Sequence, residues 1–339
     1  MKFREKFIQL KKALKFVSPL ISLCINLSCY SDTTANIGNY QKGMSLPSWE
    51  QNEYIDERVL ESLTELKIIG ADYIAVTPTW FQTTKYSNKI YPTEKTPTDS
   101  AVRYVIDLAH ILCFKVMLKP HLDVEDGSSR IEISPTSIDD WASAYRKFIN
   151  HYAVIARATK VDEFCIGTEL KGLSGSPIWQ EIIDSIKAIY TGPLTYAANW
   201  NEYPNVNFWS KLDYIGIDAY FPIAVSREAT VEEYLDNLRL WIEQIDHFQG
   251  VVNKKIIITE VGFRSIKGSG VNPWDWQYSG IMDVRSQADA YRIVLQTLPT
   301  KDWLAGIFFW YWPCLLDYDI TGYSPYNKEA EEILRTFWQ

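Results

Sequence analysis

The chain has 339 residues, a mass of 39.2 kDa and a formal net charge of −8 at pH 7. Its composition, with 47% hydrophobic and 22% charged residues, is that of a globular protein and excludes a disordered chain. A pI of about 5.2 argues against nucleic acid as the main partner, because nucleic-acid binding normally needs a basic face. The 13 Trp and 21 Tyr fit either a large aromatic core or a cleft that stacks on flat faces such as those of sugar rings.

The first 29 residues have the pattern of an export leader. Basic residues between Lys2 and Lys15 precede an apolar run from Phe16 to about Leu27, which is shorter than the ~20 residues that span a bilayer. Cys29 follows in Asn-Leu-Ser-Cys, which is similar to a loose lipobox. We therefore expect export, either as a secreted protein or lipid-anchored to the bacterial envelope through Cys29; mass spectrometry of the mature N-terminus distinguishes these from a cytosolic N-terminal helix.

The cysteines and histidines do not show the spacing of a metal site. No CxxC pair occurs, and Cys24 lies in the leader, so we expect Cys113, Cys165 and Cys314 to be buried free thiols. The four histidines also lack metal-ligand spacing. We expect neither a metal nor a cofactor.

After the leader, short β-rich apolar runs alternate with longer amphipathic stretches. The runs predict eight strands, at 41–45, 73–78, 115–120, 163–168, 193–197, 214–219, 255–259 and 305–310. The stretches predict helices at 56–69, 100–112, 138–159, 179–190, 231–248 and 286–298. This alternation favours a single-domain α/β fold, a closed (β/α)8 TIM barrel over residues 36–339. An open doubly wound sheet is the alternative, but no glycine-rich phosphate loop follows the first strand.

Polar and aromatic residues follow nearly every predicted strand, where a (β/α)8 barrel carries its active site. The longest irregular segment, 263–283, would lie over this mouth. The candidate ligand contacts at the strand ends are Trp80, Gln82, Lys119, His121, Asn199, Trp200, Asp218, Trp310 and Trp312.

Two of the strand-end residues are carboxylates: Glu169 follows FCIGT and Glu260 follows IIIT. On strands roughly across a barrel from each other, two carboxyl groups can face one another over the mouth. Cleavage of a glycosidic bond needs one carboxylic acid to protonate the leaving oxygen and one carboxylate to attack the anomeric carbon or to activate water. Tyr220 is a candidate hydrogen-bond donor to the second group.

Several motifs together resemble glycoside hydrolase family 113, a family of β-1,4-mannanases. They are KGMSLPSWEQNEY, VTPTWFQ, KVMLKPHLDVEDG, FCIGTEL, LTYAANW, DYIGIDAYFP, ITEVGFRS and GIFFWYW. The resemblance implies a retaining double displacement with Glu169 as the acid/base, Glu260 as the nucleophile and Tyr220 bonded to the nucleophile. It also implies sugar contacts at Trp80, His121, Asn199, Trp310 and Trp312.

The chain departs from the family pattern after Gly127, where Ser128-Ser129-Arg130 stands in place of a Trp-Arg pair. Thr168 precedes the acid where the wider clan has Asn, so the partner of the sugar's 2-hydroxyl must come from elsewhere. The leading hypothesis is a monomeric hydrolase acting on mannan, glucomannan or manno-oligosaccharides. The alternatives are the same mechanism on another β-linked glycan and a non-catalytic carbohydrate-binding surface protein; metal or nucleotide chemistry is disfavoured.

Overall fold

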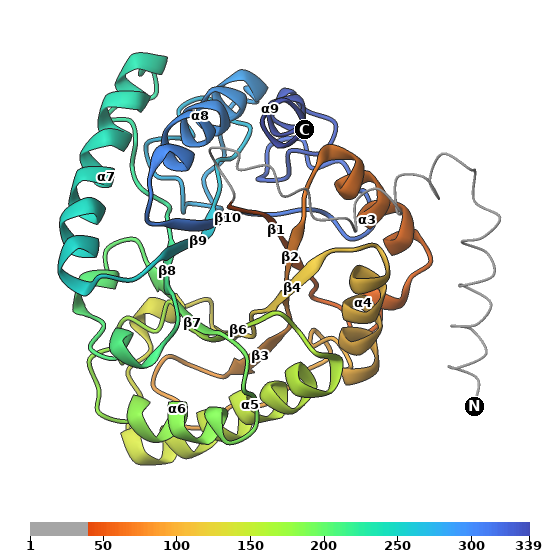
Figure 1. Ribbon diagram of the computed structural model, residues 1–339, viewed down its shortest axis with the longest axis vertical. Coiled ribbons are helices and arrows are strands. Elements are labelled where there is room, and N and C mark those ends of the chain that lie inside the picture. The colour runs from red at the N-terminus through yellow and green to blue at the C-terminus, as the bar shows by residue number, and fades with distance from the viewer. Residues whose placement is uncertain (1–39) are drawn as a thin grey trace.

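Eight parallel strands close into a barrel in the computed structural model, which describes residues 40–339 (Figure 1). The leader, Cys29 and the predicted domain start at residue 36 lie outside these residues. Around the ring the order is β1-β10-β9-β8-β7-β6-β4-β2, and β2 pairs with β1. The strands are β1 (Gln41–Pro47), β2 (Tyr73–Thr77), β4 (Lys115–Leu118), β6 (Glu163–Thr168), β7 (Leu194–Asn199), β8 (Ile215–Asp218), β9 (Ile256–Val261) and β10 (Leu304–Phe309). The (β/α)8 prediction is confirmed, and the open doubly wound sheet is excluded.

A second, two-stranded parallel sheet was not predicted. It pairs β3 (Thr79–Gln82) with β5 (His121–Val124), and each strand follows closely on a barrel strand, β2 or β4. Thr79 pairs with His121, so the chain segments after these two barrel strands stay side by side beyond the ring. This sheet decides where Trp80, Gln82 and His121 lie.

The six predicted helices are present and surround the barrel (Figure 1). They are α3 (Arg58–Ile69), α4 (Asp99–Ile111), α5 (Ile138–Thr159), α6 (Trp179–Lys187), α7 (Val231–Val252) and α8 (Val284–Thr297). A further helix that was not predicted, α9 (Glu329–Trp338), packs against α8 and α3. Two 3₁₀ turns, Tyr203–Asn205 and Trp209–Lys211, connect β7 to β8 in place of a helix.

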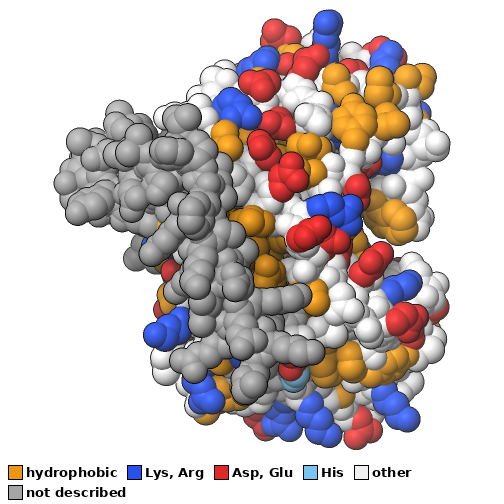
Figure 2. Space-filling model, turned by 90° about the vertical axis from the view of Figure 1, so that its right-hand side faces the viewer, with side chains coloured by type: hydrophobic (Ala, Val, Ile, Leu, Met, Phe, Trp, Pro, Cys, Tyr) orange, Lys and Arg blue, Asp and Glu red, His pale blue; other side chains and the backbone are white. Residues whose placement is uncertain are grey.

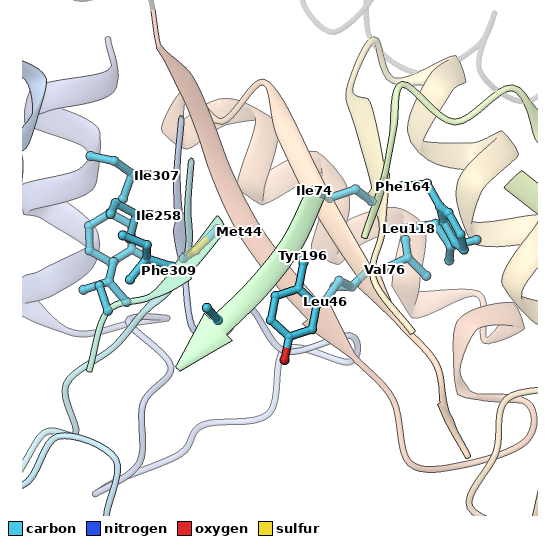
Figure 3. Close-up of a cluster of buried hydrophobic side chains, with 14 of the residues drawn as sticks. Met44, Leu46, Ile74, Val76, Leu118, Phe164, Tyr196, Ile258, Ile307 and Phe309 are labelled. Atoms are coloured by element: carbon cyan, nitrogen blue, oxygen red, sulfur yellow. The ribbon is translucent and has the colours of Figure 1, made fainter. Parts of the chain in front are cut away.

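The core has two layers, because successive side chains of a strand point to opposite faces of the barrel. The inner layer fills the ring and consists of Ala75, Met117, Cys165, Ala197, Ile257 and Phe308. The outer layer lies between strands and helices, and Figure 3 shows part of it: Met44, Leu46, Ile74, Val76, Leu118, Phe164, Tyr196, Ile258, Ile307 and Phe309. Gly43 makes room for the inner layer, since a Cβ at this position would lie 2.4 Å from the Phe308 ring.

Acidic and basic side chains are mixed across the face of the molecule seen in Figure 2. Within residues 40–339, no helix combines the length and the apolar character that crossing a membrane requires. Cys165 and Cys314 are buried free thiols as predicted, but Cys113 is disulfide-bonded. The prediction of a third free thiol is therefore wrong: Cys113 is only half-buried in the turn after α4, whereas the other two lie inside the core.

One buried carboxyl group at the N-terminal end of the barrel makes stability depend on pH. Glu163 begins β6, is 4% exposed and accepts a hydrogen bond from the Gln41 amide. Burial raises the pKa of Glu163 to about 7. The folded state therefore binds this proton more tightly than the unfolded chain, and stability falls as pH rises from about 4.5 towards 7.

We expect Glu163→Gln to remove the part of this fall that comes from Glu163, because the amide stays neutral and can still accept from Gln41. The buried carboxyl groups of Asp218 and Glu202, whose pKa values are also raised, keep their own contributions. The loss in the wild type amounts to about 3 kcal/mol for a pKa raised from 4.5 to about 7. Thermal unfolding measured from pH 4.5 to 7.5 checks it, with the exposed Glu94→Gln as the matched control. An equal pH dependence in wild type and Glu163→Gln would contradict the assignment.

Candidate active site

A buried ammonium group binds two carboxyl groups at the C-terminal end of the barrel. Lys119 directly follows β4, and its side chain is fully buried. Its Nζ donates to Glu260 Oε1 at 2.6 Å and to Asp218 Oδ1 at 3.0 Å. Lys119 and Asp218 were predicted as sugar contacts, which the structure corrects. Both are 0% exposed, so neither faces a ligand: Lys119 binds Glu260, and Asp218 accepts from Lys119.

The charges of this cluster are matched. Burial alone would lower the pKa of Lys119, but the carboxylates of Asp218 and Glu260 raise it. Burial, followed by the charge of Glu260, raises the pKa of Asp218 well above its usual value. The Thr259 hydroxyl also donates to Asp218 Oδ1, at 2.7 Å. The arrangement therefore favours a protonated Asp218 beside an ion pair of Lys119 and Glu260.

Glu260 is held at both carboxylate oxygens. It lies in β9, is 5% exposed and accepts at Oε2 from the Tyr220 hydroxyl, at 2.7 Å. Lys119 occupies Oε1, so the carboxylate cannot rotate without losing a hydrogen bond. Such donors stabilise a negative charge on a carboxylate and fix its orientation.

Glu169 has a different environment. It directly follows β6 with a φ of 53°, a left-handed conformation that is costly for residues other than glycine and that clusters at functional sites. The half-buried side chain accepts at Oε1 from Asn199 Nδ2, at 2.7 Å. Burial raises the pKa of Glu169, with Arg130 opposing the rise and Glu260 adding to it. Glu169 is therefore suited to keep a proton.

Two residues that sequence reasoning missed hold Glu169 and Asn199 in place. Glu202 is fully buried and accepts from the Tyr196 hydroxyl at 2.6 Å and from the Asn199 backbone N–H at 2.9 Å. The Tyr196 hydroxyl in turn accepts from the backbone N–H of Leu170, at 2.8 Å. Burial raises the pKa of Glu202 to about 7. In the sequence, Glu202 lies in a polar loop segment, Asn-Glu-Tyr, which gave no indication of burial.

His121 is a buried imidazole whose tautomer is set by Arg130. The Arg130 Nη1 lies 3.1 Å from His121 Nδ1, and a guanidinium can only donate, so Nδ1 is the acceptor and the proton lies on Nε2. Burial, together with the charges of Arg130 and Lys119, lowers the pKa of His121 well below its usual value. Arg130 is anchored by Asp123 Oδ1 at 2.5 Å.

The Nε2–H of His121 is an unused donor. His121 is 3% exposed, and Nε2 has no hydrogen-bond partner within residues 40–339. It lies 3.6 Å from Glu260 Oε1, too far for a hydrogen bond. A buried N–H without a partner is costly, and here it is available to a ligand group beside Glu260.

The aromatic candidates divide into two groups. Trp310 is half-buried, and its ring stacks on His121 with centroids 5.9 Å apart, which places it at the mouth. Trp200 is also half-buried and stacks on Trp274 at 5.3 Å. These two remain candidates for ligand contact.

Three other predicted contacts lie elsewhere. The Trp312 side chain is 0% exposed, and its indole N–H donates to the backbone oxygen and hydroxyl of Ser62 in α3, so its assignment as a sugar platform is wrong. Gln82 is also fully buried and is occupied by Trp141 and Thr84. The Trp80 ring packs on residues of α5, Phe148, His151 and Tyr152. Trp80 and Gln82 lie in β3, outside the ring of strands, and Trp312 is directed towards the helix layer.

Comparison with known proteins identifies the family of the chain. A model of Glycoside Hydrolase Family 113 matches residues 47–325. No curated protein matches the chain. The structure is similar to the family 113 β-mannanase of Alicyclobacillus acidocaldarius in complex with ManMIm, at 25% identity and a TM-score of 0.81, covering 88% of this chain and 97% of that one.

A second family 113 β-1,4-mannanase superimposes with a TM-score of 0.78 at 26% identity, covering 89% of this chain and 99% of that one. A β-glucuronidase from Ruminococcus gnavus shares the fold alone, with a TM-score of 0.61 at 12% identity over 88% of this chain and 50% of that one. Since the family match spans most of the barrel and the two similar mannanases are covered almost completely, the chain belongs to Glycoside Hydrolase Family 113 and is a glycoside hydrolase.

Proposed function

We propose that the chain is a retaining β-mannanase that cleaves β-1,4-mannosidic linkages with Glu169 and Glu260. One observation carries the proposal: two glutamates at one barrel mouth have opposite environments. Glu260 is held by an ammonium and a phenol, whereas burial and the charge of Glu260 raise the pKa of Glu169. When one environment stabilises a charged carboxylate and the other favours a protonated carboxyl group, the first group is the charged partner and the second is the acid.

In the first step, the Glu260 carboxylate attacks the anomeric carbon while Glu169 gives its proton to the glycosidic oxygen. The bond between the anomeric carbon and this oxygen breaks, the shortened glycan leaves as an alcohol, and an ester joins the sugar to Glu260. In the second step, Glu169 takes a proton from water, whose oxygen attacks the anomeric carbon and releases Glu260. Lys119 and Tyr220 stabilise the carboxylate both before attack and as it leaves.

Mannose as the reacting sugar is supported by the two similar mannanases, and His121 lies where it can bind the hydroxyl beside the anomeric carbon. The hydroxyl next to the anomeric carbon must lie near the nucleophile, and His121 Nε2 lies 3.6 Å from Glu260 Oε1. Thr168 stands before the acid, so this chain has no asparagine there for that hydroxyl. We infer that the neutral His121 donates to it, with Trp310 stacked on the imidazole as a platform for the ring.

A panel of β-linked hexasaccharides tests the proposal directly. We expect the enzyme to hydrolyse mannohexaose in preference to cellohexaose and xylohexaose. NMR should show the β-anomer as the first product, because two displacements at one carbon restore its configuration. A first product in the α-form would contradict the double displacement, and cleavage of only cellohexaose or xylohexaose would contradict mannose specificity.

Arg130 allows a separate test of the electrostatics. Its charge lowers the pKa of Glu169, so Arg130→Gln should raise this pKa and move the alkaline limb of kcat/KM against pH to higher pH. In Arg130→Gln the guanidinium that donates to His121 Nδ1 is also lost, so the tautomer of His121 is no longer fixed. We expect kcat/KM to fall about tenfold to a hundredfold, since losing a hydrogen bond to a charged group costs about 1.5–3 kcal/mol.

Arg130→Lys is the matched control, because it keeps the charge but not the fork that reaches both Asp123 and His121. It should lose activity while its alkaline limb stays near that of the wild type. An alkaline limb that does not move in Arg130→Gln would show that the guanidinium does not tune Glu169.

A further inference from the structure

The loop between β9 and α8 presents an exposed tryptophan at the mouth. Trp274 is 41% exposed, although a residue of this size is usually largely buried. We propose that Trp274 is the platform of a sugar-binding subsite for a pyranose on the leaving-group side of the scissile bond. The inference rests on the proposed function, because it assigns one more sugar of the same glycan.

The first support is the aromatic chain that holds one face of Trp274. Its ring stacks on Trp200, with centroids 5.3 Å apart and planes at 23°. Trp200 meets the edge of Trp241 at 5.3 Å, and Trp241 stacks on the buried Phe221 at 5.1 Å. The Trp241 indole N–H is fixed by the Pro222 carbonyl. The indole is therefore supported from behind by rings that reach the core.

The second support is that the loop around Trp274 is tied to the rest of the mouth. The Tyr323 hydroxyl donates to the Pro273 carbonyl, and Arg264 donates to the carbonyls of Asp275 and Tyr278. Asp275 Oδ1 accepts from the backbone N–H groups of Gln277 and Tyr278. These contacts fix the backbone on both sides of Trp274. Ligand binding therefore loses little conformational entropy in this loop.

The third support is the position of this platform relative to the two glutamates. Trp200 directly follows Asn199, whose amide donates to Glu169. On the other side, Tyr323 packs edge-on against Tyr220, the donor to Glu260. The stacked pair Trp200–Trp274 therefore lies beside the end of β7 that carries Asn199, the partner of the acid, and the acid protonates the oxygen of the departing sugar. A pyranose has an apolar face of C–H groups that suits a flat, fixed aromatic surface.

The test compares substrates with and without a sugar at this position. Mannohexaose can place sugars on the leaving-group side, whereas a nitrophenyl β-mannobioside has only nitrophenol there. For Trp274→Ala we expect the ratio of kcat/KM, mannohexaose over nitrophenyl mannobioside, to fall about tenfold, as the loss of one stacked apolar face implies. Trp274→Phe, which keeps a ring, should recover most of the ratio. A ratio that stays at the wild-type value in Trp274→Ala overturns the subsite.

Binding without turnover separates this inference from the proposed function. Calorimetry of mannohexaose, cellohexaose and xylohexaose with Glu260→Gln, with and without Trp274→Ala, should show about tenfold weaker binding of the recognised glycan when the indole is absent. Equal affinity in both variants overturns the subsite and leaves the proposed function standing. If the wild type hydrolyses none of the three glycans, the mannanase proposal fails and the calorimetry alone decides on Trp274.

Discussion

The ion pair between Lys119 and Glu260 is the interaction on which the rest of the site depends. An ammonium that is 0% exposed requires a partner, because an unpaired buried charge costs several kcal/mol. Glu260 in β9 supplies the counter-charge and Asp218 in the neighbouring β8 supplies a second acceptor oxygen, while Lys119 follows β4, farther around the ring. The cluster therefore joins the end of β4 to the paired strands β8 and β9, which β4 does not pair with, and fixes the Glu260 carboxylate at the mouth.

Around this pair, each remaining charge has a defined role. Tyr220 completes the hold on Glu260, and Arg130, anchored by Asp123, keeps His121 neutral with its free N–H beside Glu260. Glu169 has no cation in direct contact within residues 40–339 and is bound by the neutral amide of Asn199. The left-handed backbone of Glu169 and the burial of Glu202 both destabilise the folded state. The free energy gained by burying the large two-layer core offsets this cost.

The sequence predicted the positions of strands well where apolar residues dominate a segment. Apolar runs located all eight barrel strands to within two residues, because a strand buried on both faces is apolar throughout. The direction in which a side chain points was harder to predict. Trp310 and Trp312 lie two residues apart, yet Trp312 turns outward to Ser62 after the strand has ended. The pair β3–β5 was too short and polar to detect, so Trp80 and Gln82 were misplaced. Glu202 and Arg130 lie in irregular segments that have no helix or strand period, so no local pattern revealed that Glu202 is buried or that Arg130 binds both Asp123 and His121.

The central claim, that Glu260 is the nucleophile held by Lys119 and Tyr220, is most directly tested by trapping the ester. A 2-deoxy-2-fluoro-mannosyl fluoride with β-configuration slows both steps but keeps a good leaving group, so the covalent intermediate accumulates. Peptide mapping by mass spectrometry should then find the fluorosugar on Glu260, with labelling lost in Glu260→Gln. A fluorosugar attached to any other residue would contradict the account.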